Sequence, residues 1–258
     1  MKNILVYGAN SFIGHHFISE LYSKYQIIAV VRRKNLKNYK FKNKVKKIIS
    51  YEDFYKGNKD LLKSCDAILH LSCVNEKNQN KNIKTTKKVN NTDVIKLFKF
   101  SMKNKIKKFI FLSSFRVYGS NLNVNERSKT LENNMYTKLK IKTENELLYL
   151  QNNIDLKILR ISNVIGNPLS NKNDIWHLAF FDFVLGALHK SRIKLKSDGS
   201  QVRNYIFIED LINKLKLIIE NNYKFRLSNI CSNFSINIKN ISLLIGEIIY
   251  SSLKSKIK

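Results

Sequence analysis

Short apolar runs that alternate with helical stretches constrain the fold of this chain more than any other feature. Nearly continuous apolar strands separated by helices are typical of a parallel sheet that is covered on both faces. The sequence therefore predicts an α/β fold with a doubly wound parallel sheet. The expected strands are residues 3–7, 26–32, 46–49, 67–71, 108–113 and 156–161, and the expected helices are residues 12–24, 92–103 and 135–150.

After residue 160 this alternation becomes looser. Pro168, the only proline of the chain, stands in a polar loop where the pattern changes. We therefore expect a first domain over residues 1–166 and a smaller lobe over residues 167–258, interleaved with the first. The elements expected in the second part are helices at 175–189, 210–220 and 238–252 and a strand at 205–208.

Composition excludes several classes of protein. The chain holds no apolar run long enough to span a membrane and enters a strand at once, without the architecture of a signal peptide. Its three cysteines lie far apart and show no metal spacing, which fits the reducing cytoplasm. The net charge of +28 comes mostly from lysines spread along the whole chain. We expect a solvated surface that attracts anionic substrates, with no metal, membrane or nucleic-acid partner.

A glycine turn follows the first strand. Residues 8–14 read Gly-Ala-Asn-Ser-Phe-Ile-Gly and open the first expected helix. In this context Gly8 permits the tight turn, Gly14 lets helix and strand pack closely, and the helix N-terminus presents N–H groups to a pyrophosphate. The usual dinucleotide-binding fingerprint has a further glycine between these two, and this chain has Ser11 there. The Ser11 side chain narrows the room for the phosphates. The residues expected to contact a dinucleotide here are Gly8, Asn10, Ser11, Phe12, Ile13 and Gly14.

The end of the second strand indicates which dinucleotide is bound. An acidic residue there would accept hydrogen bonds from the adenosine ribose, but the chain reads Val-Val-Arg-Arg-Lys over residues 30–34. Arg32 and Arg33 suit a 2′-phosphate, so the Rossmann domain is expected to favour NADP(H) over NAD(H). NAD(H) stays possible, because these cations could simply be solvated charges in a lysine-rich protein.

A Tyr-x-x-x-Lys pattern points to redox chemistry. It occurs three times, at Tyr55/Lys59, Tyr136/Lys140 and Tyr250/Lys254. Only the second follows an apolar run that ends in paired serines, Ser113-Ser114, and opens a helix free of Gly and Pro. On a helix the two side chains share one face. A phenol has a pKa of about 10, and a neighbouring cation lets it act near neutral pH.

With these residues assembled, the chain resembles the extended short-chain dehydrogenase/reductases, the NAD(P)-dependent nucleotide-sugar epimerase/dehydratase/reductase family. The resemblance runs from residue 3 to about residue 250. It rests on six motifs in the family's order, at residues 8–14, 66–72, 113–119, 136–144, 160–166 and 198–205.

The resemblance implies roles for individual residues. Ser114 would hydrogen-bond the reacting oxygen, Tyr136 would be the acid/base, and Lys140 would assist the phenol and bind the nicotinamide ribose. Leu71 and Ser72, in the motif at the fourth strand, would contact the cofactor. Asn163 and Arg203 match positions that contact the diphosphate of a nucleotide sugar. The alternatives are that Asn163 caps a turn and that Arg203 is a solvated arginine at a strand edge.

The resemblance also bears on the reaction. Sugar dehydratases of this family place an Asp-Glu pair directly after the catalytic Ser/Thr, where this chain has Phe115-Arg116. We therefore expect an NADPH-dependent reductase of a nucleoside-diphosphate 4-keto-(6-deoxy)sugar, acting in surface-polysaccharide precursor synthesis. One alternative is a 4-epimerase that uses bound NAD. Another is an atypical dinucleotide-binding regulatory or interaction protein, because the chain stops earlier than extended members normally do. Family members commonly dimerise through the helices expected at 92–103 and 135–150.

Overall fold

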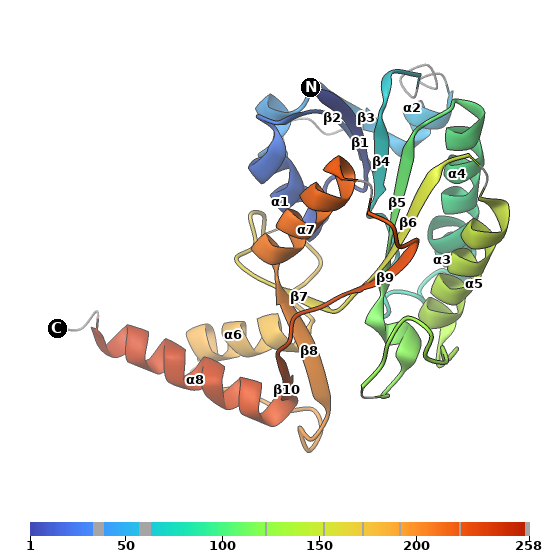
Figure 1. Cartoon of the computed structure of the whole chain (residues 1–258). Coiled ribbons are helices and arrows are strands. Elements are labelled where there is room, and N and C mark those ends of the chain that lie inside the picture. The colour runs from blue at the N-terminus through green and yellow to red at the C-terminus, as the bar shows by residue number, and fades with distance from the viewer. Residues whose placement is uncertain are drawn as a thin grey trace.

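The computed structural model describes residues 1–32, 39–56, 63–121, 123–151, 153–171, 173–190, 192–221 and 223–255. Its centre is a seven-stranded sheet with the order β3-β2-β1-β4-β5-β6-β9 (Figure 1). Every neighbouring pair in this sheet is parallel, which confirms the predicted doubly wound α/β fold. The strands are β1 (Lys2–Tyr7), β2 (Tyr25–Val31), β3 (Lys47–Ser50), β4 (Ala67–His70), β5 (Lys108–Ser114), β6 (Asp155–Ile161) and β9 (Leu227–Ile230).

Helices cover both faces of this sheet. Alternate strand residues point to opposite faces, so Ile4 and Val6 pack with α1 (Phe12–Leu21) and α7 (Ile208–Glu220), whereas Leu5 packs with α4 (Asp93–Lys103) and α5 (Met135–Leu150). Figure 1 shows these two helical layers on either side of the strands. The shorter helices of this part are α2 (Tyr51–Lys56), α3 (Ile83–Lys87), the π-helix η4 (Lys88–Thr92) and the 3₁₀ helices η2 (Lys42–Lys44) and η5 (Phe115–Tyr118).

A smaller lobe is built around a three-stranded sheet with the order β10-β8-β7 (Figure 1). Its strands are β7 (Asn163–Ile165), β8 (Val202–Phe207) and β10 (Ser235–Asn237), and its helices α6 (Ala179–Lys190) and α8 (Ile238–Ser255) pack against each other. The chain returns to the large lobe after β8, because α7 packs on the large sheet and β9 is one of its strands. None of the described helices combines the length and the apolar composition needed to cross a membrane.

Several expected boundaries differ from the structure. The helix expected at 175–189 begins only at Ala179, because Ile175 and Leu178 close a turn and the Trp176 indole donates to the Asn171 carbonyl at 3.2 Å. The helix expected to end at residue 24 ends at Leu21. The strand expected at 205–208 begins earlier, at Val202, and Ile208 already starts α7.

Part of the lysine excess has a structural role. Lys108 is buried and donates to the carbonyls of Ile218 and Asn221, at the C-terminal end of α7. Lys2 donates to the Ile219 carbonyl at 3.1 Å. Helix C-termini leave carbonyl groups without intrahelical partners and carry the negative end of the helix dipole. These lysines therefore cap α7 and tie it to the sheet, while burial lowers the pKa of Lys108.

Two buried histidines predict a dependence of stability on pH. Burial lowers the pKa of His15 to about 4 and that of His70 to about 3, from an ordinary value of 6.5. Below pH 6.5 the unfolded chain binds protons that the folded chain does not, so stability falls as the pH falls toward these values. The slope from each histidine is up to about 1.4 kcal/mol per pH unit. Urea unfolding between pH 7 and pH 5 measures it, and a His15→Asn/His70→Asn variant should show a flatter profile.

Candidate active site

The glycine turn between β1 and α1 is packed against the end of β4. Gly8 has a φ of 92°, and a Cβ there would lie 2.7 Å from the Ser72 nitrogen. A Cβ on Gly14 would lie 2.5 Å from the Ala9 carbonyl oxygen. Only glycine fits these two positions, as expected of a turn that brings backbone N–H groups close to a phosphate.

Ser11 is the N-cap of α1, so the glycine turn also starts the helix. The Ser11 hydroxyl accepts a hydrogen bond from the Gly14 N–H at 3.1 Å, so it caps the helix where a glycine would leave more room. The N–H groups of Phe12 and Ile13 belong to the first helical turn, which has no intrahelical acceptors. The Asn10 carbonyl accepts from the Asn173 side chain at 3.2 Å. The turn is therefore suited to hold a pyrophosphate at the positive end of α1.

The other residues expected to contact the cofactor follow the ends of β4 and β2. The Leu71 N–H donates to the Tyr7 carbonyl at 2.8 Å, and the Ser72 hydroxyl accepts from the Tyr51 phenol at 2.8 Å. Burial raises the pKa of Tyr51 to about 12, and the charge of Arg32 opposes this rise. Arg32 is exposed at the end of β2, whereas Arg33 lies outside the described residues. The structure thus brings Tyr51 and Ser72 into contact, and the charge of Arg32 acts on the Tyr51 phenol.

Ser114 and Tyr136 meet at the carboxyl end of β5. The Ser114 hydroxyl caps η5 by accepting from the Arg116 N–H at 3.2 Å, and Asn134 caps α5, whose first turn holds Tyr136. The Ser114 hydroxyl lies near enough to the Tyr136 phenol to influence its pKa. Burial raises the pKa of Tyr136, and the Ser114 hydroxyl and the charge of Arg116 oppose that rise. The predicted acid/base and its hydroxyl partner are therefore adjacent.

Lys140 lies one turn further along α5, on the same face. Its side chain is buried, and its Nζ donates to the Leu112 carbonyl at 2.7 Å. The Nζ lies 5.8 Å from the centre of the Tyr136 ring. Burial lowers the pKa of Lys140. The ammonium is fixed under the phenol and uses one of its three donors on the strand, which leaves others for a ribose hydroxyl.

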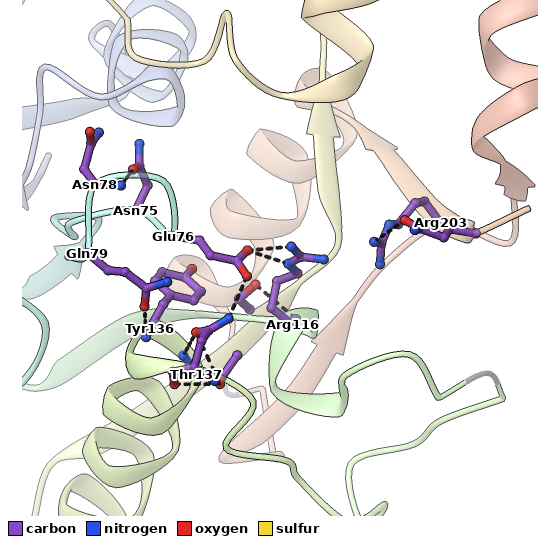
Figure 2. A network of polar contacts seen from close by, with 11 residues as sticks. Asn75, Glu76, Asn78, Gln79, Arg116, Tyr136, Thr137 and Arg203 are labelled. Atoms are coloured by element: carbon purple, nitrogen blue, oxygen red, sulfur yellow. Dashed lines mark hydrogen bonds and ion pairs between the residues drawn. The ribbon is translucent and has the colours of Figure 1, made fainter. Parts of the chain in front are cut away.

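A polar network that the sequence did not indicate surrounds Tyr136. The Glu76 carboxylate accepts from the Arg116 Nε at 2.9 Å and from the Asn134 Nδ2 at 2.6 Å, and the Gln79 Oε1 accepts from the Tyr136 N–H at 2.5 Å (Figure 2). Both side chains come from the loop after β4, which carries no recognisable motif. One signal was available, because Glu76 is the only carboxylate in the lysine- and asparagine-rich stretch from residue 67 to residue 92.

Arg203 and Asn163 lie on the small sheet. Asn163 stands opposite Tyr205 in the β7–β8 register, and its amide donates to the Asn204 carbonyl at 2.9 Å. The Arg203 Nη2 donates to the Gln201 side chain at 3.1 Å, and Figure 2 shows Arg203 across from Arg116. Burial, followed by the charge of Arg116, lowers the pKa of Arg203. The two residues expected to bind the diphosphate thus share one strand pair.

A loop between β7 and α6 joins the glycine turn to the loop after β4. Asp174 accepts from the Asn75 side chain at 2.9 Å and from the Asn78 side chain at 2.8 Å. The preceding residue, Asn173, makes the contact with Asn10. This loop therefore links both sides of the expected cofactor site.

The fold and the site together define a class of enzyme. A parallel sheet, a glycine turn at a helix N-terminus and an adjacent Ser, Tyr and Lys are the parts of a dinucleotide-dependent enzyme that acts on a carbonyl or carbinol. Among the residues that the structure describes, no group of three potential ligands is placed to hold a metal ion.

Comparison with known proteins identifies the family. The model of the NAD dependent epimerase/dehydratase family matches residues 4–231. The chain belongs to this family, whose members and structural relatives are nucleotide-sugar epimerases and dehydratases. The expected resemblance is confirmed.

Curated relatives are distant. An uncharacterized protein of Methanocaldococcus jannaschii is 24% identical over 99% of this chain and 83% of its own length. A dTDP-D-glucose 4,6-dehydratase of Dictyostelium discoideum is 25% identical over 92% of this chain, which spans 60% of that protein.

Solved structures with the same fold cover nearly the whole chain. A UDP-glucuronic acid 4-epimerase of Bacillus cereus, in complex with UDP-glucuronic acid and NAD, has a TM-score of 0.83 and 23% identity, covering 95% of this chain and 82% of that one. A UDP-N-acetylglucosamine 4-epimerase of Methanobrevibacter ruminantium has a TM-score of 0.82 and 24% identity, and the match covers 96% of this chain and 82% of that one.

Proposed function

We propose that this protein is an NADPH-dependent reductase of a nucleoside-diphosphate 4-keto sugar, with or without a 6-deoxy group. The observation that carries the proposal is the composition of the site around Tyr136. Ser114, Tyr136 and Lys140 supply what carbonyl reduction needs, whereas the Asp-Glu pair that dehydration needs is replaced by Phe115 and Arg116. Net reduction consumes NADPH, which suits the cation at Arg32.

The chain's own residues account for the proton in this reaction. When bound, the reduced nicotinamide supplies the hydride that the sugar's carbonyl carbon accepts. Tyr136 gives its phenol proton to the carbonyl oxygen, and Ser114 holds that oxygen by a hydrogen bond, so the product is a carbinol. The Lys140 ammonium stabilises the phenolate left behind. Arg203, whose planar guanidinium matches a phosphate, would hold the diphosphate, with Asn163 beside it.

Arg32 is expected to determine the preference for NADPH. Arg32→Glu should weaken NADPH binding by about 10-fold or more and leave NADH binding nearly unchanged, because a charge-assisted contact to the 2′-phosphate is lost. Titration with each nucleotide, followed by nicotinamide fluorescence, measures this. Lys46→Glu is the matched control, since it makes the same charge change at an exposed lysine before β3. Equal loss for NADPH and NADH would contradict the assignment.

The reaction itself is tested by offering purified enzyme and NADPH a panel of UDP- and dTDP-linked 4-keto sugars. Stoichiometric oxidation of NADPH with formation of the 4-hydroxy sugar supports a reductase. The second candidate is a 4-epimerase that keeps NAD bound, and it is favoured by the two 4-epimerases with the same fold. Tightly retained NAD(H) in the purified protein, with interconversion at C4 and no net NADPH use, would identify it.

The proposal extends to the cellular setting. We infer a cytoplasmic enzyme of surface-polysaccharide precursor synthesis, by analogy with the family. A homodimer would form through α4 and α5, which contact each other on one face of the sheet. Sedimentation equilibrium of the purified protein tests this oligomeric state.

A further inference from the structure

The main chain of Tyr136 is held by a residue of another segment. Asn134 is the N-cap of α5, so Tyr136 is the second residue of the helix and its N–H has no acceptor within the helix. The Gln79 Oε1 accepts from this N–H at 2.5 Å, as Figure 2 shows. Glu76, from the same loop after β4, accepts from the Asn134 Nδ2 at 2.6 Å. The first turn of α5 is therefore completed by side chains from that loop.

The Gln79 side chain is itself fixed. Gln79 is only 7% exposed, although it lies in an irregular loop. Its main-chain carbonyl accepts from the Thr86 hydroxyl at 2.8 Å, in a buried contact with α3. A closely packed side chain on an anchored backbone has few other rotamers. The amide oxygen therefore stays where the Tyr136 N–H points.

A second contact holds the same loop against α5. Asn90, in the π-helix η4, is 1% exposed. Its side chain accepts from the Val74 N–H at 2.7 Å and donates to the Val74 carbonyl at 2.9 Å. Its own carbonyl accepts at 2.9 Å from the hydroxyl of Thr143, about two helical turns after Tyr136. The loop and the helix are thus joined at two points, which fixes Gln79 relative to Tyr136.

The other two members of the site take their positions from β5. Ser114 is the last residue of that strand, and the Lys140 Nζ donates to the Leu112 carbonyl at 2.7 Å. Tyr136 instead stands in the first turn of a helix, and helix ends fray unless they are held. Fraying would move the phenol relative to Ser114 and Lys140. A displacement of about 1 Å can cost about 10²-fold in rate.

We propose that Gln79 is a positioning residue of the reaction, whose amide oxygen keeps the Tyr136 phenol aligned with Ser114 and Lys140. This inference rests on the proposed function, because it takes Tyr136 as the acid/base. It goes further by giving a role in the reaction to a loop without a recognisable motif. Gln79 acts through the main chain of Tyr136 and takes no part in proton transfer.

The test compares Gln79→Met, which removes the acceptor at similar side-chain length, with Gln79→Glu, which keeps an acceptor. Gln79→Met should lower kcat about 10- to 100-fold and change KM and NADPH affinity by less than about twofold, because only alignment is lost. Gln79→Glu should keep kcat within about threefold of wild type. Exchange of the Tyr136 amide hydrogen, followed by NMR, should be faster in Gln79→Met and unchanged in Gln79→Glu.

Gln26→Met is the matched control. Gln26 is exposed on β2, and its side chain accepts from the Lys46 Nζ at 3.0 Å, so this change removes the same kind of contact from a different part of the fold. It should alter neither kcat nor the exchange of the Tyr136 amide. Gln79→Asn, whose amide is one carbon shorter, takes the place of Gln79→Met if urea unfolding shows that the methionine variant does not fold.

A wild-type kcat in Gln79→Met would overturn the proposal. So would an equal fall of kcat in Gln79→Met and Gln79→Glu, since the acceptor would then not matter. Equal exchange of the Tyr136 amide in all three proteins would also overturn it, whatever reaction the enzyme catalyses. The proposed function is decided separately, by whether the wild type consumes NADPH or interconverts C4 epimers. Tyr136 is the acid/base in both reactions, so the variants are compared with wild type in either case.

Discussion

Replacing Tyr136 by Phe is expected to lower kcat for NADPH-dependent reduction by about 10²- to 10⁴-fold. The variant lacks only the hydroxyl that protonates the reacting oxygen, while its ring keeps the packing above Lys140. The NADPH affinity should change by less than about twofold, because the glycine turn, Arg32 and Ser72 are untouched. Single-turnover oxidation of NADPH measures the chemical step, and fluorescence titration measures binding.

Tyr149→Phe is the control for this variant. Tyr149 lies on the same helix, α5, and is 89% exposed, so removing its hydroxyl should leave the rate unchanged. A Tyr136→Phe enzyme that reduces substrate at the wild-type rate would show that another group gives the proton. Glu76 would then be the next candidate, because its carboxylate borders the same site.

Glu144→Gln is expected to cost about 3–5 kcal/mol of unfolding free energy, because it leaves a buried guanidinium without its counterion. Glu144 on α5 is 1% exposed and Arg160 on β6 is 5% exposed. The carboxylate accepts from the Arg160 Nη2 at 2.6 Å and from the Ser113 hydroxyl, and the Arg160 Nη1 donates to the Tyr118 phenol at 2.8 Å. This network joins α5, which carries Tyr136, to β5, which carries Ser114, and to β6.

Urea unfolding measures the loss, with Glu132→Gln as the control. Glu132 pairs with Lys138 at 3.6 Å, and both side chains are more than half exposed, so breaking that pair should cost less than about 1 kcal/mol. A double variant, Glu144→Leu with Arg160→Met, should recover most of the stability, because both charges of the buried pair are then removed. If Glu144→Gln unfolds at the wild-type midpoint, the network does not hold the site together.

The large sheet could be predicted because most of its strands are short apolar runs in the sequence. Residues 108–113 and 156–160 are buried, and a strand that is buried on both faces has few alternative structures. The short strands β7 and β9 could not be predicted in the same way. Asn163 and Asn229 interrupt their apolar pattern, and both strands form only because a neighbouring strand offers a ladder. Their place in the sheets is decided by tertiary contacts.

The residues of the candidate site also fall into two groups, those predictable from local sequence and those placed by tertiary contacts. Gly8, Gly14, Ser114, Tyr136 and Lys140 follow from local spacing, since each motif lies within one turn or one helix. Glu76 and Gln79 come from an irregular loop, and their position beside Tyr136 depends on how that loop folds over α5. Arg116 was visible only as a departure from a dehydratase motif. Its ion pair with Glu76, which joins segments 40 residues apart, requires the three-dimensional structure.

Transfer of deuterium from the C4 position of labelled NADPH to a nucleotide-linked 4-keto sugar tests the central claim most directly. The account predicts that the label appears at sugar C4 in the 4-hydroxy product, with one NADP⁺ formed for each sugar reduced, and that Tyr136→Phe loses this transfer. Interconversion of C4 epimers without incorporation of label, by enzyme that retains NAD, would contradict it and establish the epimerase instead.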